Sequence, residues 1–173
     1  MTPEVTHKVA KATNEVEFLA PPHSIEAEQS VLGGLLLDNA AWDRLGGILK
    51  EVDFYRFEYR LIFHHIVRLV AASKPADVIT VFESLQASGK ADESGGAEYL
   101  NALVRNTPSA ANIRHYAQII RDRSILRQLI TVCNETIADA IQTRGKDRRF
   151  FRNQTYLPLS RLMSHPVSHQ KRA

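Results

Sequence analysis

The stretch SIEAEQSVLGGLLLDN, residues 24–39, joins a helix-start signal to an apolar run that contains two adjacent glycines. Ser24 is a typical N-cap residue, and Glu26 and Glu28 lie in the first turns, where they complement the positive end of a helix dipole. The large apolar residues that follow at helical spacing are Ile25, Leu32, Leu35 and Leu36. The stretch therefore predicts a helix with a buried face.

The glycine pair, Gly33 and Gly34, has two interpretations: a phosphate-binding loop or a point of close helix packing. A P-loop has the form GxxxxGK[ST], because its backbone N–H groups surround phosphates and its hydroxyl holds magnesium. Neither Gly-Lys pair of the chain is followed by Ser or Thr, and no predicted strand precedes the glycines. Two glycines destabilise a helix by about 2 kcal/mol relative to alanine. We therefore interpret them as a notch for close packing of a neighbouring helix.

Helix signals continue along the chain as far as residue 107. Further helices are predicted at residues 40–49, 54–73, 77–89 and 97–106. In the second of these, apolar residues recur at steps of three and four, at Phe54, Phe57, Leu61, Ile62, Ile66, Leu69 and Val70. Asp77 is the predicted N-cap of the third and Gly89 its predicted stop. Because no strand pattern interrupts them, the predicted fold class is all-α, a compact bundle of about five short helices.

A much longer helical pattern runs from Asn112 to Thr143 without a helix breaker. At 1.5 Å per residue it would be about 48 Å long, too long to lie within a globule of this size. We expect part of it to project from the bundle. From Leu126 onward, spacings of three and four residues suit a seam for a partner helix. The predicted seam consists of Leu126, Leu129, Ile130, Cys133, Ile137 and Ile141.

The charge of the chain divides it into segments. Residues 1–143 carry 14 Lys and Arg against 18 Asp and Glu, whereas residues 144–173 carry 8 against 1. The mildly acidic body offers no electrostatic footprint for phosphates. The expected organisation is a disordered leader at 1–20, a globular subdomain at 21–107, the long helix at 108–143 and a basic, disordered tail at 144–173.

Residues that could perform chemistry are isolated from one another. His64 and His65 point about 100° apart on a helix and so cannot share a metal ion, and we expect one of them half-buried beside an exposed one. Cys133 lies in an apolar stripe and is interpreted as a small packing residue. We therefore expect no catalytic residue, no metal site and no cofactor. The first twenty residues lack a signal-peptide core, and no run is apolar enough to span a bilayer, which favours the cytoplasm.

Three stretches together resemble the amino-terminal domain of DnaB-type replicative DNA helicases. They are PPHSIEAEQSVLGGLLLDNAAWD, DFYRFEYRLIFHHI and YLNALVRNTPSAANIRHYAQIIRDRSILRQLI, and the likeness covers roughly residues 21–143. The resemblance implies an all-helical globule followed by a long helical hairpin. In that family, hairpins pair into dimers, three dimers form the collar of a hexamer, and primase docks on the collar.

The resemblance also implies what this chain lacks. ATP and magnesium are bound in the family by a RecA-like ATPase domain, whose Walker motifs do not occur here. The expected partners are further copies of the chain, primase and a helicase loader, with DNA contacted only indirectly and no membrane. Residues 144–173 depart from the family near Lys146, and we interpret the change as the truncation of a helicase chain by a shift of reading frame.

Three functions follow as hypotheses. The leading one is a binding module that acts in primosome assembly through self-association and primase recruitment. The second, an ATP-driven 5′ to 3′ helicase, conflicts with the absence of a P-loop. The third is a small nucleic-acid-binding protein that acts through its basic tail or through a helix-turn-helix-like pair around residues 77–104.

Overall fold

The computed structural model describes residues 20–107 and 109–142. In this part of the chain every regular element is helical. The elements are α1 (Ile25–Leu37), α2 (Ala41–Leu45), the 3₁₀ turn η1 (Glu51–Asp53), α3 (Phe57–Ala71), α4 (Val78–Ala87), α5 (Gly96–Arg105) and α6 (Ile113–Gln142). The all-α prediction, with short helices followed by a long one, is confirmed. The predictions for the leader and for the tail at 144–173 lie outside the described residues.

The predicted helix ends are present as capping structures. The Ser24 hydroxyl accepts a hydrogen bond from the Ala27 amide at 3.2 Å, as an N-cap does. Asp77 and Thr80 form a reciprocal capping box at the start of α4, with the Thr80 amide 2.9 Å from the Asp77 carboxylate. Gly89 follows α4 with a φ of +68°, the left-handed conformation that ends a helix.

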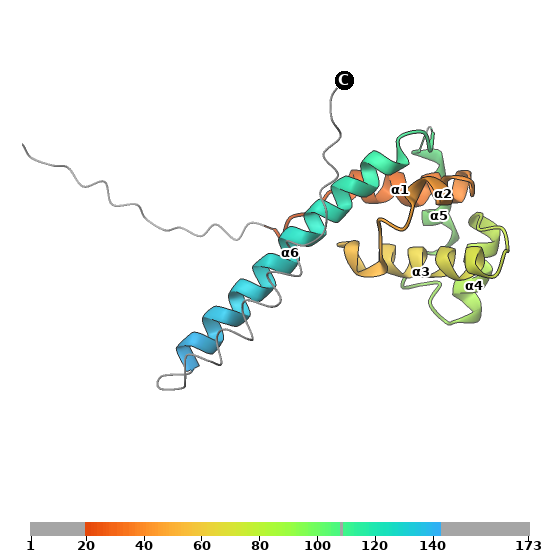
Figure 1. Cartoon of the computed structure of the whole chain (residues 1–173). Coiled ribbons are helices and arrows are strands. Elements are labelled where there is room, and N and C mark those ends of the chain that lie inside the picture. The colour runs from red at the N-terminus through yellow and green to blue at the C-terminus, as the bar shows by residue number, and fades with distance from the viewer. Residues whose placement is uncertain (1–19, 108, 143–173) are drawn as a thin grey trace, which may run out of the picture.

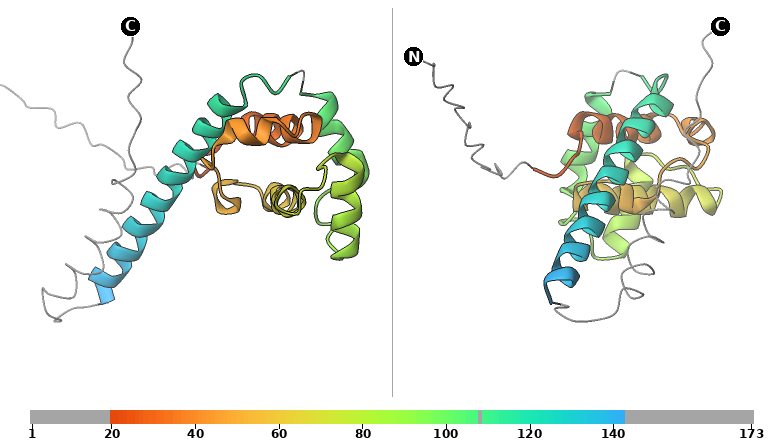
Figure 2. Two further views of the ribbon diagram at one scale, coloured as in Figure 1. Left: turned by 45° about the vertical axis from the view of Figure 1, so that its right-hand side comes forward. Right: turned by 60° about the vertical axis from the view of Figure 1, so that its left-hand side comes forward.

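Helix α1 contacts α2, α3, α5 and α6, and α4 packs against α3 and α5 (Figures 1 and 2). Residues from every element around it contribute to one apolar core. Its largest fully buried apolar and aromatic side chains are Tyr59, Phe54, Phe63, Leu32, Leu35, Ile62, Ile66, Leu85, Leu100, Ile113 and Ile120. The apolar face predicted for residues 24–39 is therefore the face around which the other helices pack.

The start of α3 differs from the sequence prediction. Phe54 lies before the helix, in extended backbone, and is fully buried. Phe57, the first helical residue, is 55% exposed, and Tyr59 is the aromatic residue that enters the core. Phe54 and Phe57 are three residues apart, a spacing that is also typical of a helix, and the sequence prediction therefore began the helix too early.

Helix α6 packs on the globule with its first half and extends beyond it with its second (Figure 1 and the left view of Figure 2). Ala117, Ile120 and Ser124 are buried, whereas no residue of α6 described beyond Ser124 is. At 30 residues the helix is about 45 Å long. None of the helices described here is both long and apolar enough to cross a membrane.

Candidate functional site

The glycine pair of α1 lies inside a helix and against other elements. A Cβ atom at Gly33 would overlap the Thr107 hydroxyl and the carbonyl oxygen of Leu103, at the end of α5. At Gly34 a Cβ atom would be 3.3 Å from the Cβ of Ala110. Both glycines are buried. The backbone of α1 thus approaches the end of α5 more closely than any side chain at position 33 allows, and the pair forms no loop that could surround a phosphate.

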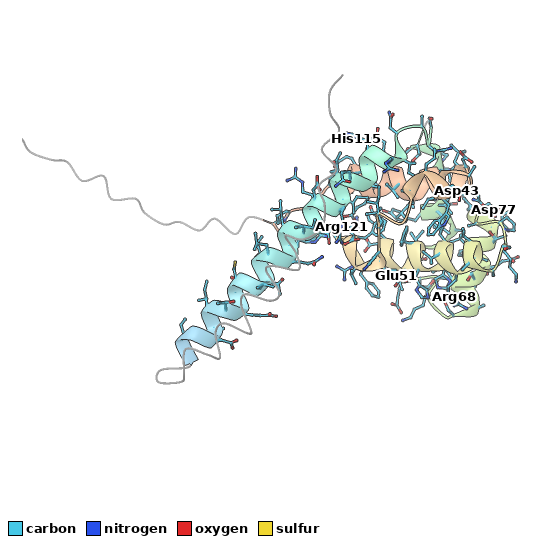
Figure 3. The ribbon with its side chains drawn as sticks, viewed as in Figure 1. Asp43, Glu51, Arg68, Asp77, His115 and Arg121 are labelled. Carbon is cyan, nitrogen blue, oxygen red and sulfur yellow. The ribbon has the colours of Figure 1, made fainter. Side chains whose placement is uncertain are left out.

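The first half of α6 is attached to the globule by a buried polar network around Asp53. Arg121 Nη1 and Ser124 Oγ each donate to the same carboxylate oxygen at 2.7 Å. Asp53 is fully buried, and the amide of Lys50 donates to its second oxygen at 2.8 Å. Figure 3 places Arg121 on α6 beside the globule. Because every oxygen of the carboxylate has a partner, the buried charge is compensated.

Arg127 extends this attachment by one further turn of α6. Its guanidinium donates to the carbonyl oxygen of Pro22 at 2.7 Å and to that of Asp53 at 2.5 Å. The guanidinium also lies over the ring of Tyr55, 5.8 Å from the centroid. One side chain therefore fixes α6 to the segment before α1 and to the segment before α3.

A second buried carboxylate, Glu28, lies close to the same junction. It accepts a hydrogen bond from the Tyr55 amide at 2.8 Å and is 1% exposed. Burial raises the pKa of Glu28, while the amides of Tyr55 and Arg56 and the charge of Arg127 oppose the shift. The sequence prediction treated Glu28 as a dipole-complementing residue. Its position, three and four residues before Val31 and Leu32, was the signal that it belongs to the buried face.

The second half of α6 presents the predicted seam to solvent. Leu126, Leu129, Ile130, Ile137 and Ile141 are between 38% and 70% exposed, and Cys133 is exposed as well. At 100° per residue the six positions fall within a sector of about 120°. The centre of that sector points roughly 140° away from the buried residues of the first half of the helix. We call these six residues the distal stripe.

The two adjacent histidines have separate structural partners. His65 is 2% exposed, and its Nδ1 lies 2.7 Å from the Ser84 hydroxyl. His64 is partly exposed, with its Nδ1 2.7 Å from a carboxylate oxygen of Glu51. Burial lowers the pKa of His65, and the charges of His64 and Arg68 add to this. The prediction of a half-buried histidine beside an exposed one underestimated the burial of His65, whereas the side chain of His64 is 42% exposed. Across the described ranges, no three potential metal-ligating side chains gather in one place.

The described residues form a helical globule from which one long helix projects, with exposed apolar side chains along its second half. The model of the DnaB-like helicase N terminal domain matches residues 20–122. The chain belongs to that family, which confirms the resemblance stated from the sequence.

Named relatives support the assignment. The replicative DNA helicase DnaB of Haemophilus influenzae is 45% identical over 137 residues, which are 79% of this chain and 29% of the relative. DnaB of Pasteurella multocida is 44% identical over 129 residues, 75% of this chain and 28% of the relative. The chain thus spans less than a third of the length of these curated relatives.

A solved structure gives the same result for the fold. The N-terminal domain of DnaB helicase from Mycobacterium tuberculosis superimposes with a TM-score of 0.77 at 31% identity. The superposition covers 82% of this chain and 99% of that one. The match in fold therefore extends over nearly the whole of the solved domain.

Proposed function

We propose that this chain acts in DNA replication as a self-associating module that contributes to a helicase collar and recruits primase. The distal stripe is the observation that carries the proposal. Large apolar side chains that share one face of a projecting helix are typical of a surface that another helix covers. Membership of the DnaB N-terminal family supports a further copy of the chain as the partner.

The stripe has the spacing that a paired helix requires. Leu126, Ile130, Cys133 and Ile137 follow one another at steps of four, three and four, the pattern of knobs that fit between four residues of a facing helix. Arg121 and Arg127 hold the first half of α6 on the globule, on a side of the helix that the stripe does not use. Association through the stripe would therefore leave the junction between α6 and the globule intact.

Sedimentation velocity tests the self-association. We expect the full chain to sediment as a dimer or larger species, and Ile130→Asp to shift it toward the monomer, because a carboxylate would be buried in the seam. Val52→Asp is the matched control, since Val52 is 65% exposed in η1, away from the stripe. A wild-type chain that remains monomeric at high concentration, or an Ile130→Asp variant that associates as wild type does, would contradict the proposal.

Primase recruitment rests on family membership, and a helicase loader is proposed as a partner on the same ground. Surface plasmon resonance with immobilised chain and soluble primase of the same cell tests the first directly. Saturable binding of primase, with a fixed ratio of primase to collar subunits, would support it. The Val52→Asp control should bind primase as the wild type does. Absence of binding at micromolar primase would refute it.

No ATP-dependent step is part of this proposal. The glycines that the sequence offered for phosphate binding are buried in α1. A DNA-reading pair at α4 and α5 is also unsupported: eight residues, 88–95, separate the two helices, whereas a helix-turn-helix has a turn of about three or four. Nucleic-acid binding by residues 144–173 stays a prediction, because those residues lie outside the described part.

A further inference from the structure

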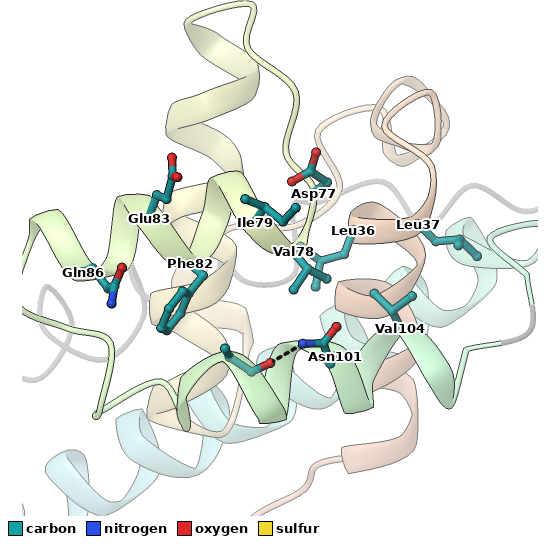
Figure 4. Close-up of a pocket in the computed structure, with 11 residues that line it drawn as sticks. Leu36, Leu37, Asp77, Val78, Ile79, Phe82, Glu83, Gln86, Asn101 and Val104 are labelled. Atoms are coloured by element: carbon teal, nitrogen blue, oxygen red, sulfur yellow. Dashed lines mark hydrogen bonds between the residues drawn. The ribbon is translucent and has the colours of Figure 1, made fainter.

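A groove runs between α4, α5 and the end of α1, on a part of the globule that the proposed collar function does not use (Figure 4). Its volume is about 670 Å³. Leu36, Val78 and Phe82 contribute apolar surface, and all three belong to or pack against the core. Two large apolar residues at its edge are strongly exposed: Ile79 at 70% and Leu37 at 50%. These side chains form an apolar surface on which the apolar residues of a partner can pack.

The walls of the groove are two helices that each present one stripe. From α4 come Ile79, Glu83 and Gln86, and from α5 come Ala97, Asn101 and Val104. Both sets have the spacing i, i+4, i+7, so each stripe follows its helix for two turns. Grooves of this shape accept an amphipathic helix, whose apolar face repeats with the same period.

The charges at the groove are of one sign. Asp77 and Glu83 are the charged residues that line it, and both are acidic. Hydrogen bonds from the Thr80 amide and hydroxyl lower the pKa of Asp77, so it is ionised at neutral pH. Glu83 takes part in none of the ion pairs found among residues 20–107 and 109–142. A complementary ligand would place positive charge beside α4.

We propose that this groove docks an amphipathic helix of another protein, with leucine-like side chains over Val78 and Phe82 and lysine or arginine beside Glu83. The proposal is independent of the collar function, because it uses neither the distal stripe nor the α6 junction. The apolar floor formed by Leu36, Val78 and Phe82 favours the apolar face of a helix over a small polar ligand.

Charge also decides against a second copy of α6 as the occupant. In residues 128–142, which include most of the distal stripe, the charged residues are Glu135 and Asp139. Both are acidic, so this half of α6 would bring like charge to the groove. A basic helix of another protein therefore complements the charge of the groove better than this half of α6 does.

Two synthetic peptides provide the test. Each has about four helical turns with leucines at i, i+4 and i+7; one carries lysines along the polar edge and the other carries glutamates. We expect fluorescence anisotropy at low salt to detect the lysine peptide and not the glutamate peptide. Glu83→Lys should weaken the lysine peptide about tenfold and allow the glutamate peptide to bind. Ile79→Ser should also weaken binding of the lysine peptide, because it removes an exposed apolar contact at the groove.

The control variant is Glu135→Lys, which changes the net charge equally at an exposed position outside the groove. It should leave the affinity for the lysine peptide within twofold of wild type. An unchanged circular dichroism spectrum shows that each variant is folded. Equal binding of the two peptides by the wild type, or equal losses for Glu83→Lys and Glu135→Lys, would overturn the proposal. A shift of the sedimenting mass by Ile79→Ser would assign the groove to a second copy and overturn it as well.

Discussion

The two halves of α6 belong to one continuous helix but differ in which side chains they bury and which they expose. The first half buries Ala117, Ile120 and Ser124 and is attached to the globule through Arg121 and Arg127. The second half exposes its largest apolar side chains and has no buried residue in the part that the structure describes. The proposed association surface therefore lies on the half of the helix whose large apolar side chains are exposed.

The difference lies in where polar groups are used. In the first half, Arg121 and Ser124 bind the buried carboxylate of Asp53, and this geometry fixes the direction of the helix. In the second half, apolar side chains point outward, so they add nothing to the fold of the isolated chain. Stability and association should therefore be separable by substitution.

The strongest test of the rigid base removes the carboxylate at its centre. Asp53→Ala leaves Arg121 without its partner and Ser124 without its acceptor, and breaking a buried pair typically costs about 3–5 kcal/mol of unfolding free energy. Urea denaturation followed by circular dichroism measures it. Glu93→Ala is the control, because its pair with Lys90 is exposed on both sides and contributes at most about 1 kcal/mol. Similar losses for the two variants would show that the network does not hold the helix.

The glycine pair offers the next largest effect and contains its own control. Gly33→Ala forces a methyl group into the Leu103 carbonyl and the Thr107 hydroxyl, so the end of α5 must move, at a cost of about 1–3 kcal/mol. At Gly34→Ala the new methyl group is 3.3 Å from the Ala110 Cβ, 3.4 Å from the Ile113 Cδ1 and 3.5 Å from the Ala110 Cα, so it meets no atom closer than 3.3 Å. The gain in helix propensity, about 1 kcal/mol, should offset that contact. Thermal denaturation should rank Gly33→Ala below the wild type and Gly34→Ala close to it; the reverse order would exclude the close approach.

Sequence patterns predicted the parts of this molecule that depend on local periodicity. The helices, the caps at Ser24 and Asp77 and the exposed spacing of the distal stripe follow from residues close together in the chain. The junction does not, since Asp53 and Arg121 are 68 positions apart and nothing local marks them as a pair. The groove was missed for the same reason: its walls come from helices that only the folded chain brings together.

The buried carboxylate of Glu28 gives the junction a dependence on pH. Because its pKa is raised above the ordinary value of 4.5, the folded state binds a proton more tightly than the unfolded state does. That contribution is present below pH 4.5 and is lost as the pH rises through the higher pKa of the folded chain. Glu28→Gln removes it, so the stability of the variant relative to wild type should increase across this range. His23 and Arg127 face the same carboxylate and oppose the effect of its burial. If the difference in unfolding free energy between Glu28→Gln and wild type stays constant with pH, these charges fully offset the burial.

The smallest expected effect concerns the second half of α6. Ile137→Ser removes a side chain that is 57% exposed, and surface substitutions of this kind usually change the unfolding free energy by no more than about 0.5 kcal/mol. Ile120→Ser, on the same helix but 1% exposed, should cost several times as much, about 2–5 kcal/mol.

Denaturation at protein concentrations below the self-association threshold isolates the monomer. Above that threshold the denaturation midpoint of the wild type should rise with protein concentration, because association stabilises only the folded state. Ile137→Ser should then have a lower midpoint than the wild type. If Ile137→Ser instead destabilises the dilute monomer as much as Ile120→Ser does, the second half of α6 is part of the fold and not a surface reserved for a partner.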